Sequence, residues 1–531
     1  MMAHVERSNE DLILTAPAVD SPPALAKPAL FVTVFLTGAA VMVIEIMGTR
    51  IIGPVFGIGL FVWSALLTVT LGALAVGYYS GGVLADRVAS TRLLGSLVLT
   101  AGLLLAVVRL ISQAVLGATE GLGPRWGALA SAALLFAPAL VFLGMTGPVA
   151  VRHATRRPGL AGHGIGSIYA VSTAGSLVGT LVLVFWVIPA FETDSIVTLT
   201  AALLTLVGGS WFAFLGRPLA LLGLLLPAFA ATTTARPLPV GLAILDRSQS
   251  LYGLVEVIED SNRAVRFLRA DHSILGAQFV RDGSAGFAFL HLLEAVRFLR
   301  PNAKDLLQIG LGIGSLPQVL GSQGMHVDSV EIDPAVVRFA KQYFGYTPTG
   351  DVLVEDARTY LRRTERRYDI IVHDTFTGGT TPEHLLSLEV LQRIHALLRP
   401  GGVLALNFIG YHEGARAEAS FAVARTLGKV FPNLRIFRDA PLSEDPEDPG
   451  NLIFFASDAA IEFKVPESAR FENDVCEQVQ RSFQTWEVLR QVPSGPVITD
   501  ARNPLARLQM PIAEKHFAAM NRLLPSALWL N

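Results

Sequence analysis

The sequence has very little cysteine and little charge for its 531 residues. Its single cysteine, Cys476, excludes an internal disulfide and any metal site built from several cysteines. Charged residues make up only 16% of the chain, and the formal net charge of -2 indicates no nucleic-acid partner. The N-terminus also lacks a basic region directly before a short apolar core, so residues 1–28 are not predicted to be a cleaved signal.

Hydrophobic residues are in excess instead. They make up 51% of the chain, and the mean hydropathy is +0.48, so much of this apolar surface has to be buried in lipid. A helix crosses the bilayer with about 20 apolar residues, and about seven such runs occur in the first half of the chain. They lie near residues 29–49, 60–84, 93–112, 127–150, 164–189, 195–214 and 218–233, the last being short. We therefore predict a disordered lead over 1–28 and a multi-pass transmembrane helical domain over 29–234.

Basic residues follow alternate runs. They are Arg87 and Arg92 after the second run, Arg152, Arg156 and Arg157 after the fourth, and Arg217 after the sixth. The other loops carry Glu120, Glu192 and Asp194. The positive-inside rule then places the basic loops and the amino terminus in the cytoplasm. Seven full crossings would leave the C-terminal domain outside, whereas a last run that does not cross would leave it inside, and the sequence does not choose between them.

Two features of the apolar half have more than one interpretation. Glu45 lies within the first run, where it could line a polar path, pair with Arg50 or bond to another helix. The segment GGVLADR at 81–87 resembles the loop between the second and third helices of major facilitator transporters. It equally fits a charged turn at a membrane surface.

The composition becomes typical of a soluble domain after a proline-containing linker over 235–246. Residues 247–280 alternate apolar and polar side chains, which predicts a small β element of hairpins. A helical pattern then completes a leading segment over 247–300, and the remainder, 301–531, is predicted to be a nucleoside-binding domain with a helical tail.

The segment LLQIGLGIGSLPQVLGSQGMHVDSVEID, over 306–333, has the pattern of a strand, a glycine loop, a helix and a second strand. Gly310, Gly312 and Gly314 would let the backbone approach a ligand closely, beside the free N–H groups of a helix. Glu331 closes the second strand about 20 residues on, where a carboxylate accepts hydrogen bonds from ribose hydroxyls. A tight turn without a ligand is the alternative.

Two further strands end on acidic residues. DVLVEDARTYL places Asp356 after one strand, and YDIIVHD places Asp374 after the next. Helical segments alternate with these strands, which predicts an α/β doubly wound, Rossmann-like sheet. Because ligands lie beyond the carboxyl ends of such strands, we expect Gly310, Glu331, Asp356 and Asp374 to converge on one pocket.

Taken together, GLGIGS, VEIDPAVVRFAKQYF, VEDARTYL, YDIIVHDTF, PEHLLS and LRPGGVLALN resemble the spermidine synthase (polyamine aminopropyltransferase) family. That family shares its fold with methyltransferases that use S-adenosylmethionine. The likeness covers residues 247 to about 457, and ITDARNPL at 498–505 resembles a tail segment of the same family. With the apolar half in front, the chain resembles bacterial inner-membrane proteins that fuse a transporter-like segment to a spermidine synthase domain.

The resemblance implies transfer of an aminopropyl group from decarboxylated S-adenosylmethionine to an amine, without a metal. The glycine loop would pass along the donor's tail, and Glu331 would hold the ribose hydroxyls. Asp356 and Ala357 would bond the adenine edge. Asp374 would orient the attacking amine and take its proton, although aspartate after a strand is also a favoured helix N-cap.

The segments that differ from the family pattern all belong, by resemblance, to the amine pocket. The acidic signature reads DTFTG after the fourth strand, without the family's second aspartate. Tyr252 is followed by Gly253 rather than glutamine, GFAFLH lacks the Tyr-His pair, and DPEDPGNLIFF replaces the late Tyr-Pro-Ser segment. The donor side is therefore better supported than putrescine as the acceptor, because a dication needs several carboxylates or aromatic faces.

Two alternatives to aminopropyl transfer remain. The same fold could serve a methyltransferase using S-adenosylmethionine itself, or a membrane transporter or sensor could bind a nucleoside or polyamine without turnover. His373, His384 and His412 fit no zinc spacing, so no metal is predicted. The expected partners are a small amine and the lipid bilayer, and the sequence is compatible with a homodimer.

Overall fold

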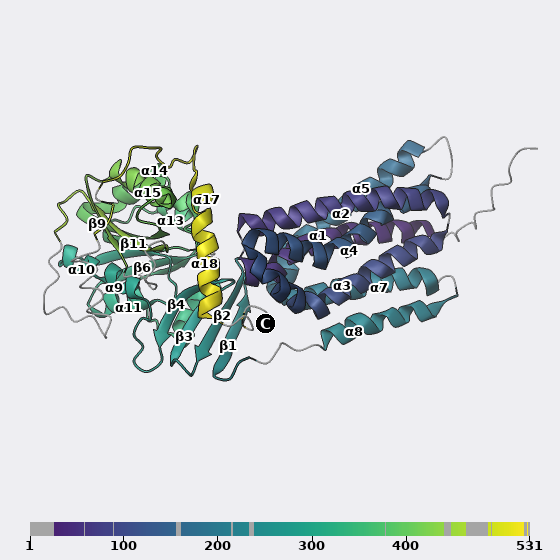
Figure 1. The fold of residues 1–531 in the computed structure, drawn as a ribbon, viewed down its shortest axis with the longest axis horizontal. Helices are drawn as coiled ribbons and strands as arrows, with labels where there is room; N and C mark the ends of the chain where they lie inside the picture. Colours follow the sequence, from purple (N-terminus) through teal and green to yellow (C-terminus); the bar gives the residue numbers. More distant parts are fainter. Residues whose placement is uncertain are drawn as a thin grey trace, which may run out of the picture.

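The structure is a computed structural model of the chain. It describes residues 26–57, 59–88, 90–155, 161–213, 216–232, 238–376, 379–439, 448–462, 487–489, 491–524 and 528. Cys476, Arg156, Arg157 and most of the predicted N-terminal lead lie outside these residues. Two parts lie end to end (Figure 1): a helical part within residues 26–232 and an α/β part within residues 238–528.

The helical part is a bundle of long helices that run back and forth along one axis (Figure 1). Its elements are α1 (Ala26–Phe56), α2 (Leu60–Arg87), α3 (Thr91–Thr119), η1 (Glu120–Leu122), α4 (Gly123–Ala154), α5 (Ala161–Val182), η3 (Leu183–Val187), α6 (Ile188–Ala190), α7 (Thr193–Ala213), η4 (Pro218–Leu224) and α8 (Leu225–Ala231). Small residues allow close packing, since a Cβ added at Gly175 of α5 would lie 2.0 Å from the Phe35 carbonyl oxygen of α1.

Five stretches of the described chain are long and apolar enough to span a membrane. One of them, Arg92–Ala154, holds both α3 and α4, so it accounts for two of the predicted runs. The last predicted run is shorter than a span, because only Pro218–Ala231 is helical there and half of it is 3-10 helix. This segment packs along α3 and α7.

The structure bears on two features of the apolar half, the segment GGVLADR at 81–87 and Glu45. GGVLADR is not a loop but the last turns of α2, where Asp86 pairs with Arg152 at 3.0 Å. The interpretation of Glu45 as a partner of Arg50 is wrong, because Arg50 donates to the carbonyl oxygen of Ser250 at 2.8 Å. Arg50 thus contacts the α/β part.

The α/β part begins with an antiparallel sheet in the order β1-β2-β3-β4. Its strands are β1 (Leu242–Gln249), β2 (Leu254–Asp260), β3 (Val265–Ala270) and β4 (Ser273–Phe279). The predicted hairpins are present, but β1 begins inside the segment expected to be a linker. It does so because LAILDRSQ pairs with β2 from Leu242 onward, Leu242 opposite Asp260.

The larger sheet has seven strands in the order β10-β11-β9-β8-β5-β6-β7. They are β5 (Asp305–Ile309), β6 (His326–Glu331), β7 (Val352–Val354), β8 (Tyr368–His373), β9 (Leu398–Gly410), β10 (Asn433–Arg438) and β11 (Gly450–Ser457). β7, β6, β5, β8 and β9 are parallel, and β11 and β10 add two antiparallel strands at one edge. The predicted Rossmann-like, mostly parallel sheet is confirmed, with every residue of β8 buried at its centre.

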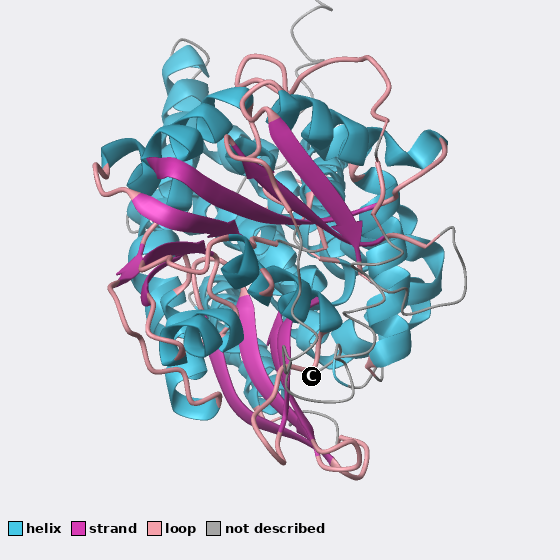
Figure 2. Cartoon of the chain, turned by 90° about the vertical axis from the view of Figure 1, so that its left-hand side faces the viewer, coloured by secondary structure: helices cyan, strands magenta, loops and turns pink. Residues whose placement is uncertain are grey.

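Helices surround the larger sheet, and the two sheets form separate groups of strands (Figure 2). The helical elements are α9 (Ala288–Glu294), α10 (Val296–Leu299), α11 (Ser315–Ser322), α12 (Pro334–Tyr343), α13 (Ala357–Arg363), η5 (Glu383–Leu385), α14 (Leu388–Leu397), η6 (Ala415–Ala417), α15 (Glu418–Gly428), α17 (Leu505–Leu508) and α18 (Met510–Leu523). Two helices that follow parallel strands are capped by aspartate side chains, α12 by Asp333 and α13 by Asp356, whereas α11 follows β5 with Gly314 at its N-cap.

The two parts are joined by direct contacts. Helix α18, in yellow in Figure 1, stands between the larger sheet and the end of the helical bundle. The rings of Phe56 and Phe517 stack with their centroids 5.9 Å apart, and Arg125 pairs with Glu514 at 2.9 Å. One hydrophobic cluster continues from the bundle into the smaller sheet and α18.

Candidate active site

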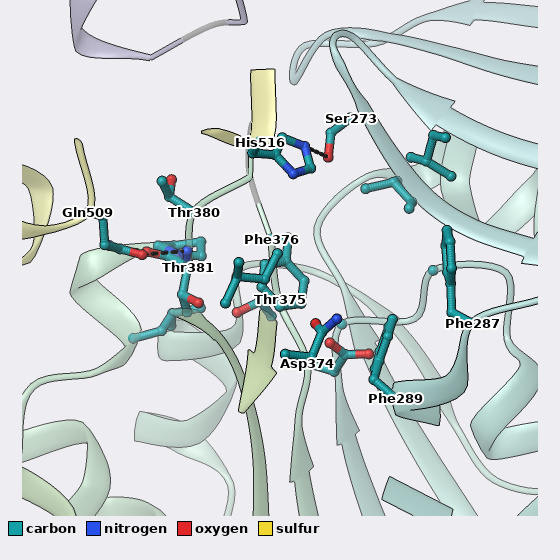
Figure 3. Close-up of a pocket in the computed structure, with 18 of the residues that line it drawn as sticks. Ser273, Phe287, Phe289, Asp374, Thr375, Phe376, Thr380, Thr381, Gln509 and His516 are labelled. Atoms are coloured by element: carbon teal, nitrogen blue, oxygen red, sulfur yellow. Dashed lines mark hydrogen bonds between the residues drawn. The ribbon is translucent and has the colours of Figure 1, made fainter. Parts of the chain in front are cut away.

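A cavity of about 1050 Å³ opens at the carboxyl ends of β5, β6 and β8. The smaller sheet, the segment before α9 and helix α18 form its other walls (Figure 3). Of the predicted site residues, Gly310, Gly312, Glu331 and Asp374 line it, as do Asp356 and Ala357 at the start of α13. The four strand-end positions therefore converge, as the order of the parallel strands requires.

Gly314 is the predicted site residue that does not line the cavity. It precedes α11 with a φ of 79°, and a Cβ there would lie 2.6 Å from the ring of Tyr346. Gly310 has a φ of 84°, and its Cβ would lie 2.0 Å from the Asp374 carbonyl oxygen. Gly310 thus lets the loop pass close to the backbone of Asp374, and Gly314 lets it pack against the ring of Tyr346. Both glycines have a positive φ, which L-residues rarely adopt.

Glu331 is the last residue of β6, and its carboxylate links this strand to the glycine loop and to the start of α12. One carboxylate oxygen accepts the N–H of Leu311 in the glycine loop at 3.0 Å, and the other accepts the N–H of Asp333 at 3.0 Å. Loss of hydration raises the pKa of Glu331, although these hydrogen bonds oppose the shift. The side chain is therefore fixed toward the cavity in the position predicted for a ribose-binding carboxylate.

Asp356 serves as a helix cap as well as a cavity wall. Its Oδ1 accepts the N–H of Thr359 at 2.8 Å, and its Oδ2 lies 3.5 Å from Nε2 of His384. Loss of hydration opposes ionisation, but the Thr359 hydrogen bonds and the nearby His384 hold the pKa of Asp356 below its usual value. Ala357 follows at the first helical position and keeps the wall beside the carboxylate small.

Asp374 lies directly after β8, and the residues that follow, as far as Phe376, are not helical. The alternative interpretation of Asp374 as a helix cap is therefore wrong. Its N–H donates to the Ile309 carbonyl oxygen at 2.8 Å, and its Oδ1 accepts Nδ2 of Asn407 at 3.0 Å. Loss of hydration raises the pKa of Asp374 to about 6, against the effect of the Asn407 hydrogen bond. It is a carboxylate at neutral pH with a pKa suited to accepting a proton.

Aromatic side chains flank Asp374. Phe287 and Phe289 stack with ring centroids 5.9 Å apart, and Figure 3 shows Phe289 beside Asp374, Phe287 beyond Phe289, and Phe376 on the other side of Asp374. The sequence pattern predicted a helix in GFAFLH, and the family resemblance assigned this segment to the amine pocket; the structure places Phe287 and Phe289 in the cavity wall. The segment turns at Gly286, whose N–H donates to the Ala277 carbonyl oxygen of β4, and this pairing brings both rings to the site.

Helix α18 forms a wall of the cavity that the sequence pattern did not predict. His516 lines the cavity, and its Nε2 lies 3.3 Å from Oγ of Ser273 (Figure 3). Burial lowers the pKa of His516 to about 4, so the imidazole is neutral at pH 7. Gln509, just before α18, forms two hydrogen bonds with the backbone of Thr381 and so fixes the segment that follows Asp374.

The three histidines considered for a metal are dispersed. His373 is buried in β8, His384 lies beside Asp356, and His412 contacts Arg438. Within the described residues, no group of three or more His, Cys, Asp or Glu side chains is arranged to hold a metal ion.

Comparisons with known proteins concern the α/β part. The family profile described as "Spermine/spermidine synthase domain" matches residues 291–437. The chain is 33% identical over 236 residues to a polyamine aminopropyltransferase of Vibrio vulnificus, covering 42% of this chain and 75% of that protein. It is 34% identical over 251 residues to an N-terminal histidine N-methyltransferase of Emericella nidulans, covering 43% of this chain and 44% of that protein.

Among solved structures, a probable spermidine synthase from Corynebacterium glutamicum aligns with a TM-score of 0.38 at 18% identity, covering 47% of this chain and 89% of that one. The chain thus spans three quarters of the bacterial transferase but less than half of the fungal methyltransferase.

Proposed function

Because the chain belongs to the spermine/spermidine synthase family, we propose that it transfers an aminopropyl group from decarboxylated S-adenosylmethionine to an amine. The observation that carries the proposal is the convergence of Glu331, Asp356 and Asp374 with the glycine loop on one cavity. Glu331 and Asp356 would hold the ribose and the adenine edge, and Asp374 would act on the acceptor.

The protein has two tasks in this reaction: to hold the amine in line with the carbon that it attacks, and to supply one base. The unprotonated amine nitrogen attacks the aminopropyl carbon bonded to the sulfonium, and a C–N bond forms as that C–S bond breaks. The electron pair of the C–S bond remains on sulfur, which becomes a neutral thioether. The proton leaves the new ammonium for the carboxylate of Asp374. With a pKa of about 6, this carboxylate is ionised at neutral pH yet basic enough to accept the proton.

The walls beside the glycine loop favour a donor without a carboxylate. The smaller sheet and the start of α9, with Phe287 before it, contribute only uncharged side chains to the cavity: Tyr252, Ser273, Ile274, Leu275, Phe287, Ala288 and Phe289. The cations that line the cavity, Arg438, Lys515 and Arg522, belong to β10 and α18 instead. The carboxylate of S-adenosylmethionine would find no countercharge in the first set of walls, a cost that the decarboxylated donor does not have.

A second candidate is methyl transfer from S-adenosylmethionine to an amine. It is favoured by the 34% identity to the N-terminal histidine N-methyltransferase. The carboxylates proposed for the nucleoside would serve either donor, so the two candidates differ at the sulfonium substituents and the acceptor.

One experiment separates the candidates. The purified full chain is incubated with each sulfonium donor and a panel of amines, and products are identified by mass spectrometry. Methylthioadenosine supports aminopropyl transfer, and S-adenosylhomocysteine supports methyl transfer. Donor binding without either product would contradict both and would support a non-catalytic binding domain.

We further propose that the helical part anchors the enzyme in a membrane, with the α/β part on the side opposite the basic loops. Arg87 and Arg152 lie in the last turns of α2 and α4, and Arg217 directly precedes η4; these ends of the helices lie away from the α/β part (Figure 1). The α/β part instead contacts the end of α1 and the start of α4. The positive-inside rule then supports an extracytoplasmic site.

The returning segment Pro218–Ala231 is consistent with that arrangement. Seven residues of 3-10 helix and seven of α-helix span about 25 Å, against about 30 Å for the hydrocarbon core. It lies along α3 and α7 and leads toward β1 (Figure 1). The short last run would therefore complete a crossing rather than turn back.

A further inference from the structure

The turn between β1 and β2 forms part of the cavity, and it is held from the helical part. Tyr252 in this turn lines the cavity next to the smaller sheet. Arg50, near the end of α1, donates to the carbonyl oxygen of Ser250 at 2.8 Å, with a longer contact to that of Leu251 at 3.5 Å. A side chain of the helical bundle therefore contacts a wall of the candidate active site.

The same turn is bonded to the carboxylates of the donor side. Oγ of Ser250 donates to Oδ2 of Asp333 at 2.6 Å, and it also accepts the N–H of Tyr252 at 3.0 Å. The N–H of Asp333 donates to Oε1 of Glu331, whose other oxygen accepts the N–H of Leu311 in the glycine loop. A continuous series of hydrogen bonds thus runs from the turn to the glycine loop.

The turn also depends on a buried acid beneath it. Oδ1 of Asp271 accepts the N–H of Leu254 at 3.1 Å, and Gly253 has a φ of 145° at a point where a Cβ would lie 2.1 Å from Oδ2 of Asp271. Loss of hydration raises the pKa of Asp271 to about 6, while the nearby cations Arg269 and Arg50 oppose the shift. The guanidinium of Arg50 is therefore both a hydrogen-bond donor to the turn and a countercharge for this acid.

We propose that Arg50 is a positioning residue of the active site, through which the helical part holds the β1–β2 turn and Glu331 in the arrangement that binds the donor. This inference rests on the proposed function. It assigns the helical part a role in substrate binding beyond anchoring, because the turn is attached to α1 on one side and to the donor carboxylates on the other.

The chain offers a matched control. Arg125 also joins the two parts, through Glu514 at 2.9 Å, but neither residue lines the cavity. Arg125→Ala therefore removes a contact between the parts without touching the turn, whereas Arg50→Ala removes the contact with the turn.

The test compares the full-length wild type, Arg50→Ala and Arg125→Ala in detergent. Calorimetric titration with methylthioadenosine should show the dissociation constant raised on the order of tenfold in Arg50→Ala and unchanged in Arg125→Ala. Amide hydrogen exchange of residues 250–253 should accelerate only in Arg50→Ala. Equal losses in both variants, or an unchanged Arg50→Ala, would overturn the proposal.

Two further measurements keep the test decisive. If Arg50→Ala does not fold, Ser250→Ala breaks the bond to Asp333 within the α/β part, and it should weaken methylthioadenosine binding by a similar factor. If the wild type binds neither methylthioadenosine nor the decarboxylated donor, the proposed function fails. Hydrogen exchange of the turn then still decides whether Arg50 holds it.

Discussion

Burial of Asp374 has opposite effects on the proposed chemistry and on the stability of the fold: it raises the pKa toward the working pH, and it makes the ionised form costly in the folded chain. A base that accepts a proton from an amine works best with a pKa near the working pH. The same loss of hydration that raises the pKa of Asp374 to about 6 disfavours its ionised form in the folded chain. Asn407 supplies a hydrogen bond to the carboxylate, and this bond limits the cost.

Replacement of the carboxylate should separate binding from turnover. Asp374→Asn keeps the size of the side chain but removes the base, so turnover should fall by on the order of 10²–10⁴-fold while donor affinity is retained. Steady-state rates and calorimetry measure the two properties. Glu365→Gln, at a carboxylate whose side chain is 89% exposed, is the control and should change neither. Unchanged turnover in Asp374→Asn would remove this residue from the mechanism.

The pH dependence of stability has a definite sign at Asp374. Its pKa is about 6 in the folded chain and near 3.8 in the unfolded chain, so its contribution to stability is fully present below 3.8 and is lost as the pH rises through 6. Asn does not ionise. The melting temperature of Asp374→Asn should therefore exceed that of the wild type at pH 8 and match it near pH 4. A difference in melting temperature that grew toward low pH would contradict the raised pKa. In a separate measurement, kcat/KM of the wild type should fall below pH 6, because the carboxylate is then protonated.

At the scale of elements, the glycine loop after β5 fixes how closely the strands approach. Gly310 and Gly324 both have left-handed backbone conformations, with φ of 84° and 93°. Gly324 has open space where a Cβ would lie, whereas Gly310 has the Asp374 carbonyl oxygen 2.0 Å away. The pair therefore distinguishes backbone strain from a steric clash.

Alanine at these two positions should have unequal effects. Each substitution incurs a backbone penalty of about 1–2 kcal/mol, and Gly310→Ala adds about 1–3 kcal/mol of overpacking. Thermal unfolding followed by tryptophan fluorescence should show the larger loss for Gly310→Ala, together with loss of methylthioadenosine binding. Equal melting temperatures would show that the loop moves freely away from Asp374.

Helix α18 illustrates how one element serves both parts. Phe517 stacks on Phe56 of α1, while His516, the preceding residue, faces the cavity. Consecutive helical side chains point in directions about 100° apart, so one helix can contact two surfaces. The cavity wall and the contact with the bundle are consequently parts of the same element.

At the scale of the whole molecule, the proposed membrane topology can be tested by cysteine labelling. In a Cys476→Ser background, Glu413→Cys reports the α/β part and Val88→Cys reports the opposite end of the bundle, at positions 72% and 40% exposed. A membrane-impermeant maleimide should label the first in intact spheroplasts and the second only in inverted vesicles. The reverse pattern would place the α/β part in the cytoplasm and overturn the assignment of its face.

The class of each part was predictable from the amino-acid pattern alone. Apolar runs have few alternatives to helices that bury them, and the alternation of strands and helices around the glycine loop has one common solution, a parallel sheet whose strand ends meet. Gly310, Glu331, Asp356 and Asp374 could be placed together for that reason. The start of the strand LAILDRSQ was placed five residues too late because a segment that follows prolines resembles a linker until its partner strand is known.

Which distant segments complete the cavity depends on how the elements pack in three dimensions. Phe287 follows the turn at Gly286, His516 reaches the cavity from α18, and the β1–β2 turn accepts a hydrogen bond from Arg50, about 200 residues earlier in the chain. The periodicity of apolar residues along the sequence indicates which side chains are buried, but it does not indicate which other elements pack against them. The convergence of Gly310, Glu331, Asp356 and Asp374 follows from consecutive strands and was predictable, whereas the wall that His516 supplies and the contact of Arg50 with the β1–β2 turn come from remote elements and were not.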